Sequence, residues 1–447
     1  MNVFGDLWQL FILAGVLAFG LIAVAGVVRW PGFGVALVTA IAVIHWEYPQ
    51  PPLLATYAGF SVYLDDAIAM LLVLAAVVNL VRAPVRLKAV HIAAATLSLT
   101  IALSVGAGAA SLELGKVIVE ARPALFVVAA LAWAFSLDWP ESSQRVAVLR
   151  RAAVGTAVAL VGSAALHAAR YGLGRADIFI RNPDGSFGEN SRVLTSPQAM
   201  LLLLAVCTLI GTTAAANRRL TFVLASAGVV TIVVSQQRTV WVAALAVVLV
   251  LLLRGSASAR IKGLAGAFVV GAAALALAVT GKWSLLNSEV GLAAIGTGTY
   301  DGRVAGWRAL WDQAFSGGFE VVWFGRPFGS GFGRYEAAGV WVEYAPHNFY
   351  LTMFLRAGLI GLAALVWFLF VAIKRSLTVA NGGWVTAMWV ALAIMCWTYT
   401  LPWFLLPIPV IALSAPMVAS SVRATRAHSA YRRIHGPSVQ VRATGRA

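Results

Sequence analysis

A histidine stands at the boundary between a long polar segment and an apolar stretch of the chain. His347 lies in the run 346–350, and the apolar stretch from about residue 349 to 373 is expected to form a helix. An imidazole at a helix N-terminus feels the positive end of the helix dipole, which disfavours imidazolium and suits the ring to accept a proton. His347 is therefore the catalytic candidate, as a general base. In the alternative interpretation, His347 only orders the start of the helix by hydrogen bonding.

Three arginines form a second group of candidates. Arg192 closes one polar segment, Arg238 begins an apolar stretch, and Arg303 lies in the longest polar segment. A guanidinium group binds phosphate oxygens through two parallel hydrogen bonds, so these three around one cavity would suit a pyrophosphate. The alternatives are a solvated charge at Arg192, snorkelling of Arg238 to a membrane surface, and a surface ion pair of Arg303 with a nearby aspartate. Secondary candidates for the same site are Arg308, Asn348 and Gln237.

The composition indicates what must position these residues. The chain is 61% hydrophobic and only 11% charged, with a mean hydropathy of +0.86, which is typical of a polytopic membrane protein. We predict an all-α polytopic membrane protein with about 12–13 transmembrane helices and one large external loop that contains short amphipathic helices. The predicted spans are 7–28, 31–46, 64–81, 89–110, 121–137, 148–169, 197–216, 220–236, 239–253, 261–280, 347–373, 381–399 and 401–421.

The distribution of Lys and Arg predicts the orientation. Basic clusters occupy alternate short connections, which should face the cytoplasm. Residues 1–280 then hold the first ten spans and a first external loop at 170–196. The large external loop is 281–346, and the C-terminal spans occupy 347–421. Residues 422–447 form a disordered, basic cytoplasmic tail. We therefore attribute the net charge of +16 to residues that orient the protein in the membrane and interact with lipid headgroups. We expect no nucleic-acid partner.

The large polar segment contains two further patterns. Apolar residues recur at helical spacing from Val304 to Phe315 and predict an amphipathic helix of about 15 residues. The glycine-rich run 325–333 predicts a tight turn in which glycines permit positive φ and close backbone approach; it lacks the lysine of a phosphate-binding loop. Cys207 and Cys396 both fall inside predicted spans, so we expect no disulfide, no metal and no cofactor.

An ordered set of short motifs resembles a known family. The motifs are Asn190-Ser191-Arg192, Ser235-Gln236-Gln237-Arg238-Thr239, Arg303-Val304-Ala305-Gly306-Trp307, His347-Asn348-Phe349-Tyr350-Leu351 and Gly358-Leu359-Ile360-Gly361. Their order and the length of the loop between them resemble the bacterial O-antigen ligase and O-antigen polymerase superfamily, over about the last 260 residues. The first half of the chain contributes only hydropathy to this resemblance.

The resemblance implies a membrane glycosyltransferase that uses a polyprenyl-pyrophosphate-linked glycan and needs neither a metal nor a nucleotide sugar. It implies that His347 is the base and that Arg192, Arg238 and Arg303 bind the donor pyrophosphate. It also implies a bacterial inner-membrane protein with a periplasmic active site, a cytoplasmic C-terminus and a glycan or glycolipid acceptor such as a lipid A core. The family has about twelve spans, so we expect one short N-terminal segment, 31–46 above all, to be re-entrant or not a span.

Three function classes remain open. A ligase transfers a finished glycan to a different acceptor, a polymerase transfers a growing chain to another lipid-linked repeat unit, and a transporter performs no chemistry. A transporter should show broken helices or mid-membrane charges in both halves of the chain. Here the ionisable candidates gather in the second half, at the predicted outer ends of spans. This pattern favours glycan transfer, and the length of the loop between Arg303 and His347 favours the ligase branch.

Overall fold

The protein is mostly helical, with three short antiparallel hairpins. The computed structural model describes residues 18–44, 53–57, 60–83, 87–139, 141–173, 179–181, 187–190, 192–212, 218–254, 261, 298–335, 341–379 and 382–414. Nearly all of the predicted span 261–280 and the whole basic tail 422–447 lie outside these ranges. The hairpins are β1 (Leu53–Tyr57) with β2 (Phe60–Tyr63), β3 (Phe179–Arg181) with β4 (Phe187–Asn190), and β5 (Arg334–Tyr335) with β6 (Trp341–Val342). The hydropathy pattern did not predict these hairpins.

Several helices have the length and apolar composition of membrane spans, which confirms the prediction of a polytopic membrane protein. Within the described residues five helices qualify, or six if one bent pair counts as a single span. The five are α3 (Leu64–Arg82), α4 (Ala89–Ser111), α5 (Leu114–Ser136), α6 (Ser142–Tyr171) and α14 (Phe349–Ser376). The shorter helices are α7 (Ser196–Thr212), α8 (Arg218–Val234), α9 (Arg238–Arg254), α15 (Gly383–Thr398), the 3-10 turn η2 (Trp403–Leu405) and α16 (Pro407–Leu413). The count of 12–13 stays a prediction.

The bent pair lies at the N-terminal end of the described chain. The helix Ala18–Arg29 and the helix that starts at Pro31 meet at an angle of 114°, as in a broken span or a re-entrant loop. Proline has no backbone N–H and suits the first turn of a helix, so the chain ends one helix and starts α2 (Pro31–Ile44) at this point. The bend falls at the segment 31–46, for which the sequence predicted a departure from a simple span.

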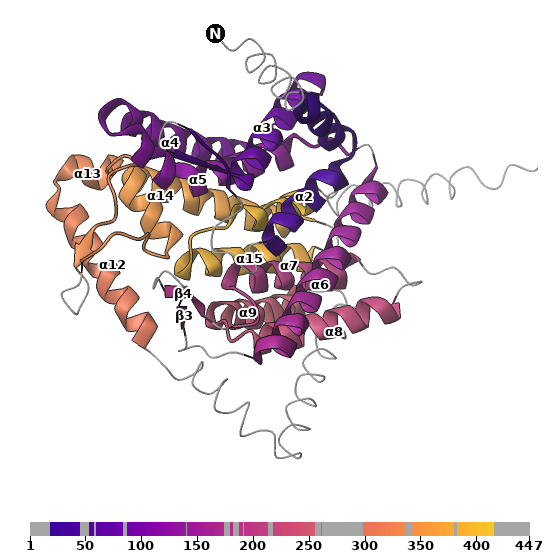
Figure 1. The fold of residues 1–447 in the computed structure, drawn as a ribbon. Helices are drawn as coiled ribbons and strands as arrows, with labels where there is room; N and C mark the ends of the chain where they lie inside the picture. Colours follow the sequence, from indigo (N-terminus) through magenta and orange to yellow (C-terminus); the bar gives the residue numbers. More distant parts are fainter. Residues whose placement is uncertain are drawn as a thin grey trace, which may run out of the picture.

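The helices pack into one bundle around a shared apolar core. Figure 1 shows α15 and α7 in the middle of the bundle, with α9 beside α15 and α14 beside α4. Trp133 of α5 and Trp389 of α15 are fully buried in this core. The Trp133 ring reaches Gly34 of α2, where a Cβ would lie 2.3 Å from the ring. A glycine at position 34 therefore leaves the space that this buried ring occupies.

The polar segment before α14 folds against α14 itself. It contains α12 (Gly298–Ser316) and α13 (Phe319–Phe324), and the predicted amphipathic helix is thus confirmed as most of α12. Trp307, Leu310 and Ala314 are buried on one side of α12, in a cluster with Leu351 and Phe354 of α14. Burial of this apolar stripe holds α12 across the start of α14.

A glycine-rich turn joins α13 to a break in α14. Gly358 lies at the break with φ of 63°, and a Cβ there would meet the carbonyl oxygen of Trp323 at 2.1 Å. Gly325 and Gly331 also have positive φ, so the predicted turn with close backbone approach is confirmed. The backbone N–H of Arg326 donates to the carbonyl of Leu355, which closes the turn onto α14 across 2.8 Å.

A buried ion pair holds the same turn from the other side. Arg356 of α14 pairs with Glu120 of α5, and the two side chains are only 3% and 11% exposed. The N–H of Gly331 donates to Glu120 Oε2 across 2.8 Å, and Arg356 also donates to the carbonyl of Gly331. The ion pair and the turn therefore satisfy each other's hydrogen-bonding groups, as a buried charge requires.

Candidate active site

His347 lies just before α14 in a turn that three neighbours define. Asn348 is the N-cap of α14, and its Oδ1 accepts a hydrogen bond from the Leu351 N–H across 3.0 Å. Trp307 Nε1 donates to the carbonyl of Pro346 across 2.5 Å. His347 itself has φ of 49°, which is uncommon for a residue with a side chain. The ring thus lies just outside the first turn of α14, which begins at Phe349 as the sequence predicted.

The surroundings of His347 favour the neutral imidazole. Its pKa is lowered to about 4, first by burial and then by the positive charges of Arg303 and Arg334. Two aromatic rings flank the imidazole, with ring centroids 5.5 Å away at Tyr399 and 6.0 Å away at Tyr344. A neutral ring nitrogen is available to accept a proton, which is the property the sequence predicted, although burial and arginines are the main cause.

Arg192 is held by a network at the junction of α8 and α9. Its Nη1 donates to Gln237 Oε1 across 2.9 Å, and the Ser196 hydroxyl donates to the same oxygen across 2.5 Å. Gln237 Nε2 donates to the carbonyl of Leu194 across 2.8 Å, which fixes the amide. Gln236, the preceding residue, has φ of 57°; in the described chain it is the one other non-glycine residue besides His347 with positive φ. Such backbone strain concentrates at functional sites.

Arg303 connects α12 to the end of α15. Its Nη1 donates to the carbonyl of Thr398 across 3.2 Å, where the C-terminal carbonyls of α15 attract a positive charge. The Thr398 hydroxyl is 2.5 Å from the Thr239 hydroxyl, next to Arg238 at the start of α9. Arg303 is thereby placed beside Tyr399, the residue that flanks His347.

The three predicted arginines share one electrostatic environment. The pKa of Arg192 falls to about 10 through burial first, then through the charges of Arg238 and Arg303. The pKa of Arg303 is also lowered, mainly by burial, and Arg238 contributes in the same direction. Hydrogen bonds link the same region: Arg303 donates to the carbonyl of Thr398, and the Thr398 hydroxyl contacts Thr239. Thr239 follows Arg238, and Arg192 donates to Gln237 on the other side of Arg238 in the chain. Together with His347 the three arginines form what we call the arginine–histidine cluster: Arg192, Arg238, Arg303 and His347.

The three secondary candidates, Gln237, Asn348 and Arg308, differ in burial and in hydrogen bonding. Gln237 is buried and orients Arg192, and Asn348 is buried as the cap of α14, so both support cluster residues. Arg308 is exposed on α12, whereas Arg303 on the same helix is half-buried. The two arginines of α12 thus differ in burial, and Arg308 as a site residue stays a prediction. The solvated alternative for Arg192 does not fit its hydrogen bond and partial burial.

Arg334 is the residue that the sequence interpretation missed. Only 2% of it is exposed, and its Nη1 donates to the carbonyls of Phe332 and Tyr344 across 3.1 and 2.9 Å. Its guanidinium carbon lies 4.7 Å from the centroid of the Tyr344 ring, a cation–π contact. Arg334 directly follows the glycine-rich run 325–333, which the sequence analysis interpreted only as a turn. This position was the one feature of the sequence that could have indicated Arg334 as a site residue.

The cluster combines positive charge with a neutral proton acceptor. Arg303 acts on the His347 ring, and Arg192 and Arg238 act on Arg303 or on each other. These are the groups that binding of a phosphate or pyrophosphate and proton transfer from a hydroxyl would need. Within the part of the chain that the structure describes, no three His, Cys, Asp or Glu side chains gather in a way that could hold a metal ion, and Cys207 and Cys396 are buried thiols. Comparisons with protein-family models, with curated proteins and with solved structures give no match to this chain, so the resemblance described above stays a prediction.

Proposed function

We propose that this protein is a membrane glycosyltransferase of the O-antigen ligase type. It transfers a glycan from a polyprenyl pyrophosphate carrier to the hydroxyl group of a glycan or glycolipid acceptor, with inversion at the anomeric carbon. The observation that carries the proposal is the arginine–histidine cluster, because it gathers four residues from four separate segments of the chain. The order of short motifs in the sequence points to the same chemistry.

Electrostatic repulsion within the cluster favours an anionic ligand. Burial is the main cause of the lowered pKa values of Arg192 and Arg303, and repulsion from neighbouring arginines adds to both shifts. A pyrophosphate with about two negative charges relieves this repulsion and accepts paired hydrogen bonds from the guanidinium groups. As the sugar–oxygen bond lengthens, negative charge grows on the leaving pyrophosphate, and the same arginines stabilise it.

His347 performs the proton transfer. The acceptor hydroxyl oxygen attacks the anomeric carbon, the bond from that carbon to the pyrophosphate oxygen breaks, and the electron pair leaves with the polyprenyl pyrophosphate. The hydroxyl proton passes to the His347 ring. A base with pKa of about 4 is weak, but the donor's negative charge offsets the charge of Arg303 and raises this pKa toward the working pH. Binding of the donor thereby prepares the base.

The position of the cluster in the bundle suits a lipid-linked donor. Arg238 begins α9 and His347 precedes α14, so the cluster lies at the N-terminal ends of these two helices. Their other ends carry Arg254 on α9, and Lys374 and Arg375 on α14. By the positive-inside rule, those basic ends face the cytoplasm, which puts the cluster at the periplasmic surface of the bacterial inner membrane. A polyprenyl pyrophosphate presents its charged group at such a surface.

The test is a reconstitution with defined substrates. The full-length protein is placed in liposomes with a polyprenyl-pyrophosphate-linked repeat unit, and glycan length is measured by mass spectrometry. We expect a single transfer when an acceptor glycolipid is added and none without it. A ladder of lengths from the donor alone would identify a polymerase instead. Absence of transfer in both reactions, with a folded protein, would contradict glycosyl transfer and favour transport.

A further inference from the structure

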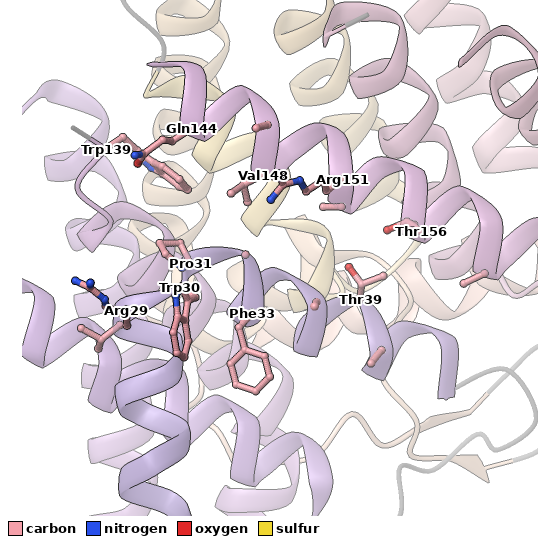
Figure 2. Close-up of a pocket in the computed structure, with 18 of the residues that line it drawn as sticks. Arg29, Trp30, Pro31, Phe33, Thr39, Trp139, Gln144, Val148, Arg151 and Thr156 are labelled. Atoms are coloured by element: carbon pink, nitrogen blue, oxygen red, sulfur yellow. The ribbon is translucent and has the colours of Figure 1, made fainter. Parts of the chain in front are cut away.

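A large cavity lies between α2 and α6, and it shares no residue with the arginine–histidine cluster. Its volume is about 1270 Å³, above the range of roughly 300–1,000 Å³ that is usual for small-molecule pockets. Figure 2 shows the space between the two helices, with Trp30, Pro31 and Phe33 on one side and Val148, Arg151 and Thr156 on the other. The bend between the helix Ala18–Arg29 and α2 forms part of its wall.

Most of the cavity wall is apolar and made of small residues. The side chains that face each other along α2 and α6 are Ala36, Ala40, Val43, Ala152, Gly155 and Ala159. Small side chains leave room between the two helices, enough for an acyl chain. An empty apolar cavity is unfavourable because the side chains that line it lose dispersion contacts. In a bilayer, a lipid acyl chain can occupy such a cavity and restore these contacts.

Charged and aromatic groups also line the cavity. Arg29 and Arg151 provide two positive charges and Asp138 one negative charge, so the wall is positive overall. Trp30 is 65% exposed at the rim, beside Pro31 (Figure 2). Basic pockets between membrane helices bind anionic lipid headgroups, and tryptophan is enriched at the headgroup level.

We infer that this cavity binds one membrane phospholipid with an anionic headgroup. The phosphate lies at Arg151, and one acyl chain runs along the small residues between α2 and α6. The lipid completes the bent N-terminal pair of helices, and the inference does not depend on the proposed glycosyl transfer.

The binding test uses native mass spectrometry of the full-length protein in detergent with dioleoyl phosphatidylglycerol. Dioleoyl phosphatidylcholine has the same chains with a zwitterionic headgroup, and inorganic phosphate has the anion without chains. We expect one tightly retained phosphatidylglycerol, weaker retention of phosphatidylcholine, and no displacement by excess inorganic phosphate. Equal retention of the two lipids would overturn the anionic headgroup, and displacement by inorganic phosphate would assign the site to the free anion.

Two pairs of variants locate the site. Gly155→Leu places a side chain in the cavity, whereas Gly162→Leu changes the same helix outside the cavity; a Cβ at either glycine has nothing within 4 Å. We expect Gly155→Leu to weaken lipid retention by at least about tenfold and Gly162→Leu to leave it within about twofold. Unchanged retention in Gly155→Leu would overturn the inference.

The second pair of variants tests whether an arginine binds the lipid headgroup, and it leaves the small apolar residues of the cavity unchanged. Arg151→Gln removes an exposed charge that lines the cavity, and Arg150→Gln removes the neighbouring charge that does not line it. Removal of one arginine near a lipid headgroup should weaken retention of phosphatidylglycerol by about fivefold, with little effect on phosphatidylcholine. Equal effects of Arg151→Gln and Arg150→Gln would contradict a specific headgroup site.

Discussion

The indole nitrogen of Trp307 donates a hydrogen bond to the carbonyl oxygen of Pro346 across 2.5 Å. This bond joins α12 to the residue immediately before His347. The same helix carries Arg303 one turn earlier, and Arg303 lowers the pKa of His347. A single amphipathic helix therefore sets both the backbone position of the candidate base and part of its electrostatic environment.

Replacement of His347 tests the base directly. The backbone at this position has positive φ, which asparagine tolerates better than most residues, so His347→Asn should preserve the turn. We expect kcat for glycan transfer to fall by about 10²–10⁴-fold, the usual contribution of a general base. His167→Asn, a histidine on α6, is the matched control and should retain activity. Full activity of His347→Asn would remove the proposed mechanism.

Two arginines on α12 distinguish donor binding from a general charge effect. Arg303 is half-buried and lies in the cluster, whereas Arg308 is exposed. Loss of a charge-assisted hydrogen bond in Arg303→Gln should raise the KM for the donor by about tenfold to a hundredfold. Arg308→Gln should leave KM within about twofold. Equal increases of KM in the two variants would mean that Arg308 belongs to the binding site after all.

The pH dependence of transfer should report the protonation of His347. Activity needs the neutral ring, so it is lost as the pH falls through the His347 pKa, which is about 4 in the unliganded protein. In a plot of kcat/KM against pH, the acidic fall in activity should lie near that value. In a plot of kcat against pH, the fall should lie at higher pH, because the bound donor raises the pKa of His347. In Arg303→Gln the limb of kcat/KM should move to higher pH, because a positive neighbour is lost. A shift to lower pH would contradict this electrostatic coupling.

The same pKa shift predicts a direction for stability. The unfolded chain has a histidine pKa near 6.5 and binds more protons than the folded protein between pH 6.5 and about 4. His347 should therefore make the folded protein less stable as the pH falls through this window. His347→Asn removes this contribution, so the variant should lose less stability than the parent between these pH values, as measured by thermal unfolding in detergent.

Trp307 tests whether the position of the turn matters for catalysis. Trp307→Phe keeps an aromatic ring beside Trp397 but leaves the buried carbonyl of Pro346 without its donor. We expect kcat to fall by about tenfold or more, because small displacements of a catalytic group reduce rates strongly. Trp311→Phe alters packing on the same helix against Phe354 and is the control for general loss of aromatic contact. Similar kcat losses in both variants would indicate a packing effect only.

The ion pair between Glu120 and Arg356 should dominate the stability of the glycine-rich turn. Glu120→Gln leaves the buried Arg356 charge unpaired and should lower the free energy of unfolding by about 3 kcal/mol. Glu113→Gln breaks an exposed pair with Lys116, in which both side chains are about 70% exposed, and should cost less than about 0.5 kcal/mol. Denaturant unfolding in detergent measures both values, and equal losses would contradict the buried role of Glu120.

The sequence by itself determined the membrane class, the approximate position of many helices, the loop helix and the location of His347 at the start of a helix. These features depend on consecutive residues, since a spanning helix needs a continuous apolar run and an amphipathic helix needs a local period. The bend at Pro31 also has a local cause. Such properties can be predicted without knowing which segments become neighbours.

Only the tertiary structure decided which polar groups share a site. Arg356 and Glu120 are 236 residues apart in the chain, and Arg192 and Gln237 are 45 apart, yet each pair is hydrogen-bonded. The different burial of Arg303 and Arg308, the burial of Arg334 and the cavity between α2 and α6 likewise follow from packing. Burial and charge–charge interactions depend on distances in space, and helix packing sets these distances through contacts that no local pattern encodes.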